Sequence, residues 1–182
     1  MNNNINEGSA IEYQEDIKLI IKKELFVELK KCVQEASPNE ACGIIFGEIA
    51  QVPNDALEND YFYYYTAKKF SCIKSDKSSM VAFLIENIEL LHQTIIKAMG
   101  ELSIKKKHRL ISIFHSHPSG NHPSTTDIEN MRLLNKFSDI DHRFISKAFK
   151  NLIWIIMDSN SFDLNGYIYL NSHLYQINIL IK

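Results

Sequence analysis

A chain of 182 residues is long enough to bury one hydrophobic core, and its content of 45% apolar and 23% charged residues excludes general disorder. The formal net charge of −2 provides no overall attraction to nucleic acid or to an anionic membrane, so we expect neither as a partner. No apolar run approaches the roughly 20 residues that span a bilayer, which argues against a membrane protein.

The N-terminal segment is polar. Residues 1–16 include three consecutive asparagines, and they lack the charged start and apolar stretch of a secretory signal. We therefore expect a flexible tail over residues 1–16 and a single domain over residues 17–182.

The cysteines are odd in number and widely spaced. Cys32, Cys42 and Cys72 include no C-x-x-C pair, which argues against a disulfide framework and against a cysteine zinc site. A reducing, cytoplasmic location is the simplest expectation.

The first predicted elements are a helix and two strands. Apolar residues at helical spacing predict a helix over residues 23–36, and Pro38 follows it. The short apolar run 41–52 predicts a buried strand, and the aromatic run 61–66 predicts a second. From residue 78 to residue 99 one long amphipathic stripe predicts a single helix that packs on the core.

The second half of the chain continues the alternation. Its predicted elements are a strand over 109–114, a helix over 127–137, a buried strand over 152–157, and two final strands over 162–170 and 174–181. We expect the final pair to form a hairpin around Asn171 and Ser172. Strands that interleave with helices predict an α/β fold with a mixed central sheet flanked by helices.

Two histidines end the strand that begins at Arg109. Because side chains alternate along a strand, His115 and His117 leave the same face and could share a metal ion. A catalytic zinc site needs a third ligand, and Asp127, which follows a loop rich in Pro, Gly and Asn, is well placed. Two alternatives remain open at this point: the histidines could be ordinary surface residues, and Ser124-x-x-Asp127 could be only a helix capping box. A carboxylate bound to zinc could not also serve the cap, so we expect these roles of Asp127 to compete.

Several separated elements together resemble one known family. These are Glu40-Ala41-Cys42-Gly43-Ile44-Ile45-Phe46-Gly47, then His115-Ser116-His117-Pro118, then Ser124-x-x-Asp127. In this order they look like the JAMM motif of MPN-plus, Mov34-like zinc metalloproteases. The resemblance covers about residues 23–170 and implies the family's cytidine-deaminase-like α/β architecture.

The resemblance implies a role for each motif residue. His115, His117 and Asp127 would bind Zn²⁺, and Glu40 would act as general base and then as general acid. Ser124 would donate a hydrogen bond to the oxyanion of the tetrahedral intermediate.

One feature departs from the family pattern. Six residues, 118–123, separate His117 from Ser124, which is one residue fewer than is usual in the family, so the loop must follow a different path. We expect His122 in this loop to be an exposed histidine rather than a ligand, and Cys42 to be a packing residue.

The resemblance also implies a substrate. JAMM domains of this kind cut peptide or isopeptide bonds after the C-terminal tail of ubiquitin or a ubiquitin-like modifier, so the expected activity is that of an isopeptidase. Whether the protein forms a homodimer or joins a larger complex stays open. The alternatives are a non-catalytic MPN scaffold, which retention of the whole motif disfavours, and a RadC-like protein, which the run His117-Pro118-Ser119-Gly120 would also fit. A zinc deaminase would need H-x-E and P-C-x-x-C, and neither is present.

Overall fold

A seven-stranded mixed sheet closes on itself, and helices cover it. The computed structural model describes residues 11–74, 79–141 and 143–182. The elements in chain order are β1 (Glu12–Ile21), α1 (Lys23–Ala36), β2 (Cys42–Pro53), β3 (Tyr61–Ile73), α2 (Met80–Glu86), α3 (Ile88–Glu101), β4 (Arg109–His117), α4 (Thr125–Ile140), α5 (Phe144–Lys147), β5 (Ile153–Asp158), β6 (Leu164–Leu170) and β7 (His173–Ile181). The expected α/β fold with a mixed sheet is confirmed.

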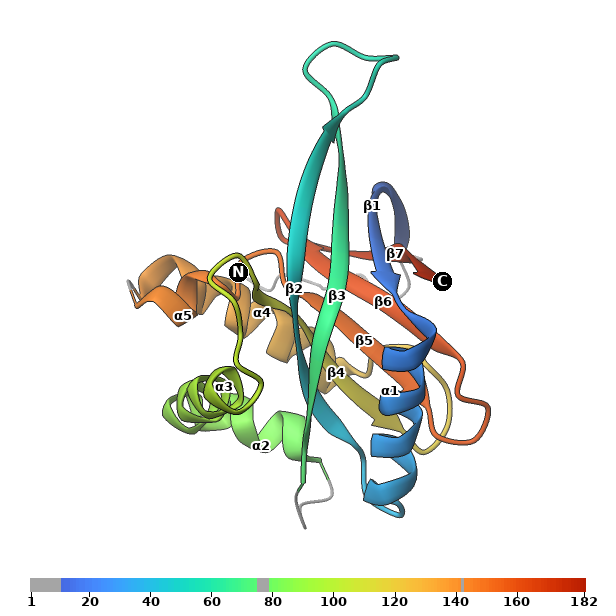
Figure 1. Cartoon of the computed structure of the whole chain (residues 1–182), viewed down its shortest axis with the longest axis vertical. Coiled ribbons are helices and arrows are strands. Elements are labelled where there is room, and N and C mark those ends of the chain that lie inside the picture. The colour runs from blue at the N-terminus through green and yellow to red at the C-terminus, as the bar shows by residue number, and fades with distance from the viewer. Residues whose placement is uncertain (1–10, 75–78, 142) are drawn as a thin grey trace, which may run out of the picture.

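The strand order is β1-β3-β2-β4-β5-β6-β7, and β7 pairs with β1 to close the sheet. In the centre, β4 lies antiparallel to β2 and parallel to β5. The β2–β3 hairpin extends well beyond the other strands (Figure 1). Because Cys42 of β2 pairs with His115 of β4, the start of β2 lies beside the end of β4, where the two histidines are.

Helices cover the sheet from two sides. Figure 1 shows α1 on one side, with α2, α3, α4 and α5 on the other. Alternate residues of β5 enter different cores: Ile153 and Ile155 pack with the α1 side, whereas Trp154 and Ile156 pack with the α2–α4 side. Burial on both faces explains why this strand has a continuous apolar run. Among the described residues, no helix is both long and apolar enough to cross a membrane.

The expected tail over residues 1–16 is wrong at its C-terminal end. Residues 12–16 belong to β1, which pairs in parallel with β7 from Glu12↔Tyr175 onward. The side chains of this part are mostly exposed, so the segment is polar even though its backbone completes the sheet. Residues 1–10 of the expected tail lie outside the described residues.

The expected single helix over residues 78–99 is also wrong. Two helices, α2 and α3, meet at Asn87, whose backbone leaves the helical region with φ −116° and ψ 67°. The Asn87 side chain donates to the Phe83 carbonyl at 2.8 Å, and such local side-chain bonds compete with helical backbone bonds. The apolar stripe continues across the break, which is why its spacing predicted one helix. Residue 78 lies outside the described residues.

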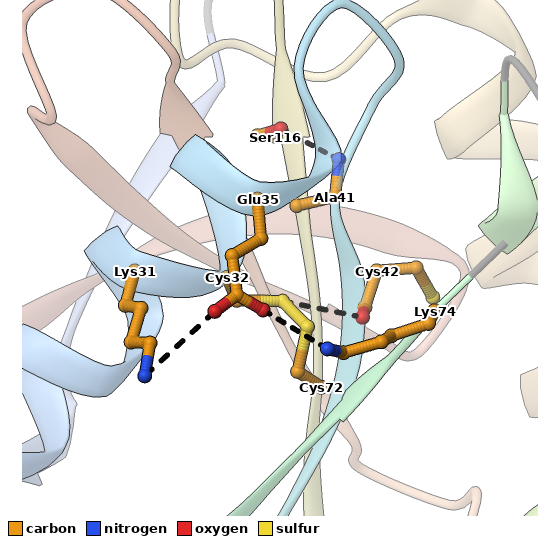
Figure 2. Close-up of a disulfide and its surroundings, with 8 residues drawn as sticks. All are labelled: Lys31, Cys32, Glu35, Ala41, Cys42, Cys72, Lys74 and Ser116. Carbon is orange, nitrogen blue, oxygen red and sulfur yellow. Dashed lines mark hydrogen bonds and ion pairs between the residues drawn. A yellow bond between two sulfur atoms is a disulfide. The ribbon is translucent and has the colours of Figure 1, made fainter.

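The expectation of no disulfide is contradicted as well. Cys32 on α1 and Cys72 on β3 form a disulfide across a sequence separation of 40 residues (Figure 2). Their Cα atoms are 5.8 Å apart because α1 packs against β3, a proximity that spacing along the chain does not reveal. Cys42 remains a free, buried cysteine, as expected of a packing residue.

Candidate metal centre

His115 and His117 are the seventh and ninth residues of β4, and they face the same side of the strand. Their Nε2 atoms lie 3.1 Å apart. The His115 side chain is completely buried, and that of His117 is 14% exposed. The same-face arrangement expected from the two-residue period of a strand is therefore confirmed.

Asp127 from α4 completes a three-residue cluster. Its Oδ1 lies 3.1 Å from His115 Nε2, and its Oδ2 lies 3.1 Å from His117 Nε2. Zinc bonds of about 2.0–2.1 Å in tetrahedral geometry place neighbouring ligand atoms about 3.3–3.4 Å apart. The donor set and the observed separations therefore fit a zinc ion bound by these three residues.

The helix cap and the histidine contacts coexist on Asp127. Ser124 is the N-cap of α4, and its backbone N–H and hydroxyl each donate to Asp127 Oδ2 at 2.7 Å. In return, the Asp127 backbone N–H donates to Ser124 Oγ at 3.2 Å. We expected capping and zinc binding to compete for Asp127; the cap and the histidine contacts coexist because two carboxylate oxygens offer enough lone pairs for both. The capping box in fact holds the carboxylate toward the histidines.

Charges around the cluster favour a cation. Burial alone would raise the pKa of the Asp127 carboxyl, but hydrogen bonds from His115, His117 and Ser124 outweigh burial and hold that pKa well below its usual range. The hydrogen bond to Asp127 raises the pKa of His117; burial opposes the rise, and nearby Glu40 adds to it. A negative environment that stabilises a proton on His117 also stabilises a divalent cation in its place.

Glu40 reaches the same site from a distant part of the chain. It precedes β2 and lines a cavity of about 360 Å³ together with His117, Ser124 and Asp127. The rest of the wall is formed by Ser79, Ala82, Pro118, Ser119 and Thr126. The structure thus places Glu40, Ser124, His117 and Asp127 around one opening, and His115 is buried beside His117 and Asp127.

The shortened loop over residues 118–123 is held from β5. Asp158 accepts hydrogen bonds from the backbone N–H groups of Gly120 and Asn160, and the Asn160 side chain donates to the Pro118 carbonyl at 2.7 Å. Gly120 has φ +81°, which glycine adopts without strain. Asp158 was not predicted from the sequence, although an acid at the end of the apolar run 152–157 was an available signal.

A second anchor for the loop comes from β6. The buried Tyr167 hydroxyl donates to the Asn121 carbonyl at 3.1 Å and lies 3.2 Å from His122 Nδ1. His122 is exposed, as expected of a loop histidine, and it is not part of the metal-ligand cluster. Nothing in the sequence distinguished Tyr167 from other core tyrosines.

Cys42 takes no part in the cluster. It pairs in register with His115, and burial raises the pKa of its thiol to about 12, with Glu40 adding to the rise. A thiol that stays protonated at neutral pH is a poor metal ligand.

Comparison with known proteins shows the family. Residues 22–165 match the family model for prokaryotic homologs of the JAB domain. The solution structure of protein DSY2949 from Desulfitobacterium hafniense is similar at 20% identity and a TM-score of 0.53, over 91% of this chain and 92% of that one, which shows a shared fold. A JAB1/MPN domain protein from Archaeoglobus fulgidus, AF2198, aligns at 14% identity and a TM-score of 0.43, over 90% of this chain and 98% of that one. No curated protein sequence matches the chain. Because the family model spans most of the domain, including every motif residue, the resemblance seen in the sequence is confirmed, and this chain belongs to the prokaryotic JAB family.

Proposed function

We propose that this protein is a zinc-dependent isopeptidase that cuts after the C-terminal tail of ubiquitin or a ubiquitin-like modifier. The observation that carries the proposal is the cluster of His115, His117 and Asp127, of which His117 and Asp127 line a cavity together with Glu40 and Ser124. When bound, zinc supplies the Lewis acidity that assists attack of water on a carbonyl group.

Glu40 is the proposed proton carrier. It lines the cavity but does not belong to the metal-ligand cluster, so its carboxylate is free to accept a proton from the attacking water. The same carboxyl group can then protonate the leaving amine. Of the residues around the opening, it is the one carboxylate that neither caps a helix nor contacts a histidine at bonding distance.

Ser124 is the proposed donor to the developing oxyanion. Its hydroxyl is exposed at the cavity, and its proton is donated to Asp127 in this structure. Donation to substrate requires a rotation about χ1 or about the C–O bond of Ser124. After this rotation the Ser124 backbone N–H still donates to Asp127 Oδ2.

The cavity walls suit an extended peptide. Ser79, Ala82 and Ser119 are small, so the opening admits a main chain without bulky side chains. A cytoplasmic location is part of the same proposal. Because disulfides are rare in that compartment, an oxidised Cys32–Cys72 pair in freshly isolated protein would count against this location.

The test compares the wild type with Glu40→Gln at matched zinc occupancy, on a panel of modifier–lysine conjugates. We expect zinc to stay near one ion per chain, while turnover falls by roughly 10²–10⁴-fold, the usual share of general acid–base catalysis. Glu35→Gln is the matched control, because Glu35 is an exposed acid of α1 whose ion pair with Lys74 is a surface contact.

Three results would contradict the proposal in different ways. Equal turnover by wild type and Glu40→Gln would remove Glu40 from the mechanism. Loss of zinc together with activity would make Glu40 a ligand. A zinc-loaded wild type that cleaves no conjugate would favour the non-catalytic scaffold.

A further inference from the structure

We infer that Ser116 is a positioning residue that holds Glu40 at the metal centre. Ser116 lies between the two histidines on β4. Its hydroxyl and its backbone N–H both bind Ala41, the residue that follows Glu40 and precedes β2. The Ala41 N–H donates to Ser116 Oγ at 2.9 Å (Figure 2). The Ser116 N–H in turn donates to the Ala41 carbonyl at 3.1 Å. The inference rests on the proposed function, because it assigns Ser116 a role in the proton transfer of Glu40.

The two hydrogen bonds mark the point where the chain leaves the sheet. The β2–β4 ladder pairs Cys42 with His115, so the next antiparallel pair would be Ala41 with Ser116. In a regular hydrogen-bonded pair both N–H groups donate to backbone carbonyls. Here the Ser116 hydroxyl replaces the Ser116 carbonyl as acceptor for the Ala41 N–H, and the regular register begins only at Cys42.

Burial makes the hydroxyl necessary. Ala41 is 1% exposed and Ser116 is 0% exposed, so water cannot replace the hydroxyl as acceptor for the Ala41 N–H. Loss of the hydroxyl would therefore release or shift the segment that carries Glu40.

The histidines have separate supports. His115 pairs in register with Cys42 on β2 and Ile156 on β5, and His117 pairs with Asp158. These backbone ladders do not depend on the Ser116 hydroxyl. Ser116→Ala should therefore disturb the position of Glu40 far more than the metal ligands.

The first measurement needs no activity: amide hydrogen exchange of the metal-free protein followed by NMR. The Ala41 amide should be protected in the wild type and should exchange at least about tenfold faster in Ser116→Ala, as expected when a buried hydrogen bond loses its acceptor. Ser112→Ala is the matched control, because Ser112 is an equally buried serine of β4 whose hydroxyl binds only the Ile113 carbonyl. Rapid Ala41 exchange in the wild type, or unchanged exchange in Ser116→Ala, would overturn the inference.

The second measurement is a double-mutant cycle on kcat with zinc-loaded enzyme. Ser116→Ala should lower kcat about tenfold when Glu40 is present and less than about twofold in the Glu40→Gln background, since coupled residues are not additive. Zinc occupancy should be unchanged, and Ser116→Thr, which keeps the hydroxyl, should restore kcat.

The outcomes separate the two claims. Equal losses of kcat in both backgrounds, in an enzyme that Glu40→Gln inactivates, would overturn the positioning role and leave the proposed function standing. A wild type that hydrolyses no conjugate would overturn the proposed function, and with it the part of Ser116 in proton transfer.

Discussion

Reduction of the Cys32–Cys72 disulfide should lower the stability of the folded protein. The bond closes a loop of about 40 residues between α1 and β3. In the chain-entropy account, cross-linking a loop of this length removes about 13 cal/mol/K from the unfolded chain, or about 4 kcal/mol at 25 °C. For a protein of this size such a loss corresponds to a decrease in Tm of roughly 8–16 °C.

Part of that loss should be offset in the reduced state. The Cys32 sulfur lies 3.8 Å from the Cys42 carbonyl, and it carries no proton to donate while the disulfide is intact. After reduction, the Cys32 thiol is placed to donate weakly to that carbonyl. The figure of about 4 kcal/mol is therefore an upper value for the effect of reduction.

The assay is thermal unfolding of metal-free protein, oxidised beforehand, with and without a phosphine reductant. Titration of thiols in denaturant should find one per oxidised chain, from Cys42, and three after reduction. Cys32→Ala/Cys72→Ala is the control, because its Tm should not respond to the reductant. Three free thiols after oxidation, or equal Tm values with and without reductant, would refute the reasoning.

Three further predictions each concern a single side chain. His117→Ala should lose most of the zinc seen by elemental analysis, whereas the exposed His122→Ala should keep it; zinc retained by His117→Ala would remove that residue from the metal site. Tyr167→Phe deletes the hydrogen bond to the Asn121 carbonyl, and urea unfolding should show a loss of about 1 kcal/mol, with unchanged stability arguing against this anchor. Burial lowers the pKa of His92, so the unfolded chain binds a proton at a pH where the folded chain does not. The free energy of unfolding should therefore fall as pH drops below about 6.5, and it should fall less in His92→Gln. An identical pH dependence in both proteins would contradict this.

The metal centre was largely predictable because its ligands depend on local periodicity. A strand places residues two apart on one face, which put His115 beside His117 without any knowledge of the rest of the fold. The Ser-x-x-Asp spacing likewise predicted the cap of α4, since a capping box needs only the first turn of a helix. The same local view led us to expect the cap and the metal role of Asp127 to compete, because it did not treat the two carboxylate oxygens separately.

The incorrect predictions involve contacts between distant segments or between a side chain and the backbone of a nearby residue. Strand β1 is held by backbone pairing with β7, which a polar side-chain pattern does not reveal. The break at Asn87 depends on a hydrogen bond from its side chain to the Phe83 carbonyl, which the spacing of apolar residues does not reveal. The disulfide depends on the packing of α1 against β3.

The sequence by itself determined the order of helices and strands through most of the chain, the face shared by the two histidines, and the family. Only the tertiary structure decided that Glu40 lies at the cavity, that Ser116 binds the backbone beside it, and that Asp158 and Tyr167 hold the shortened loop. The physical reason is the distance along the chain over which each kind of interaction acts. Side-chain periodicity and capping act within a few residues and leave a pattern in the chain, whereas these contacts join residues that only the closed sheet brings together.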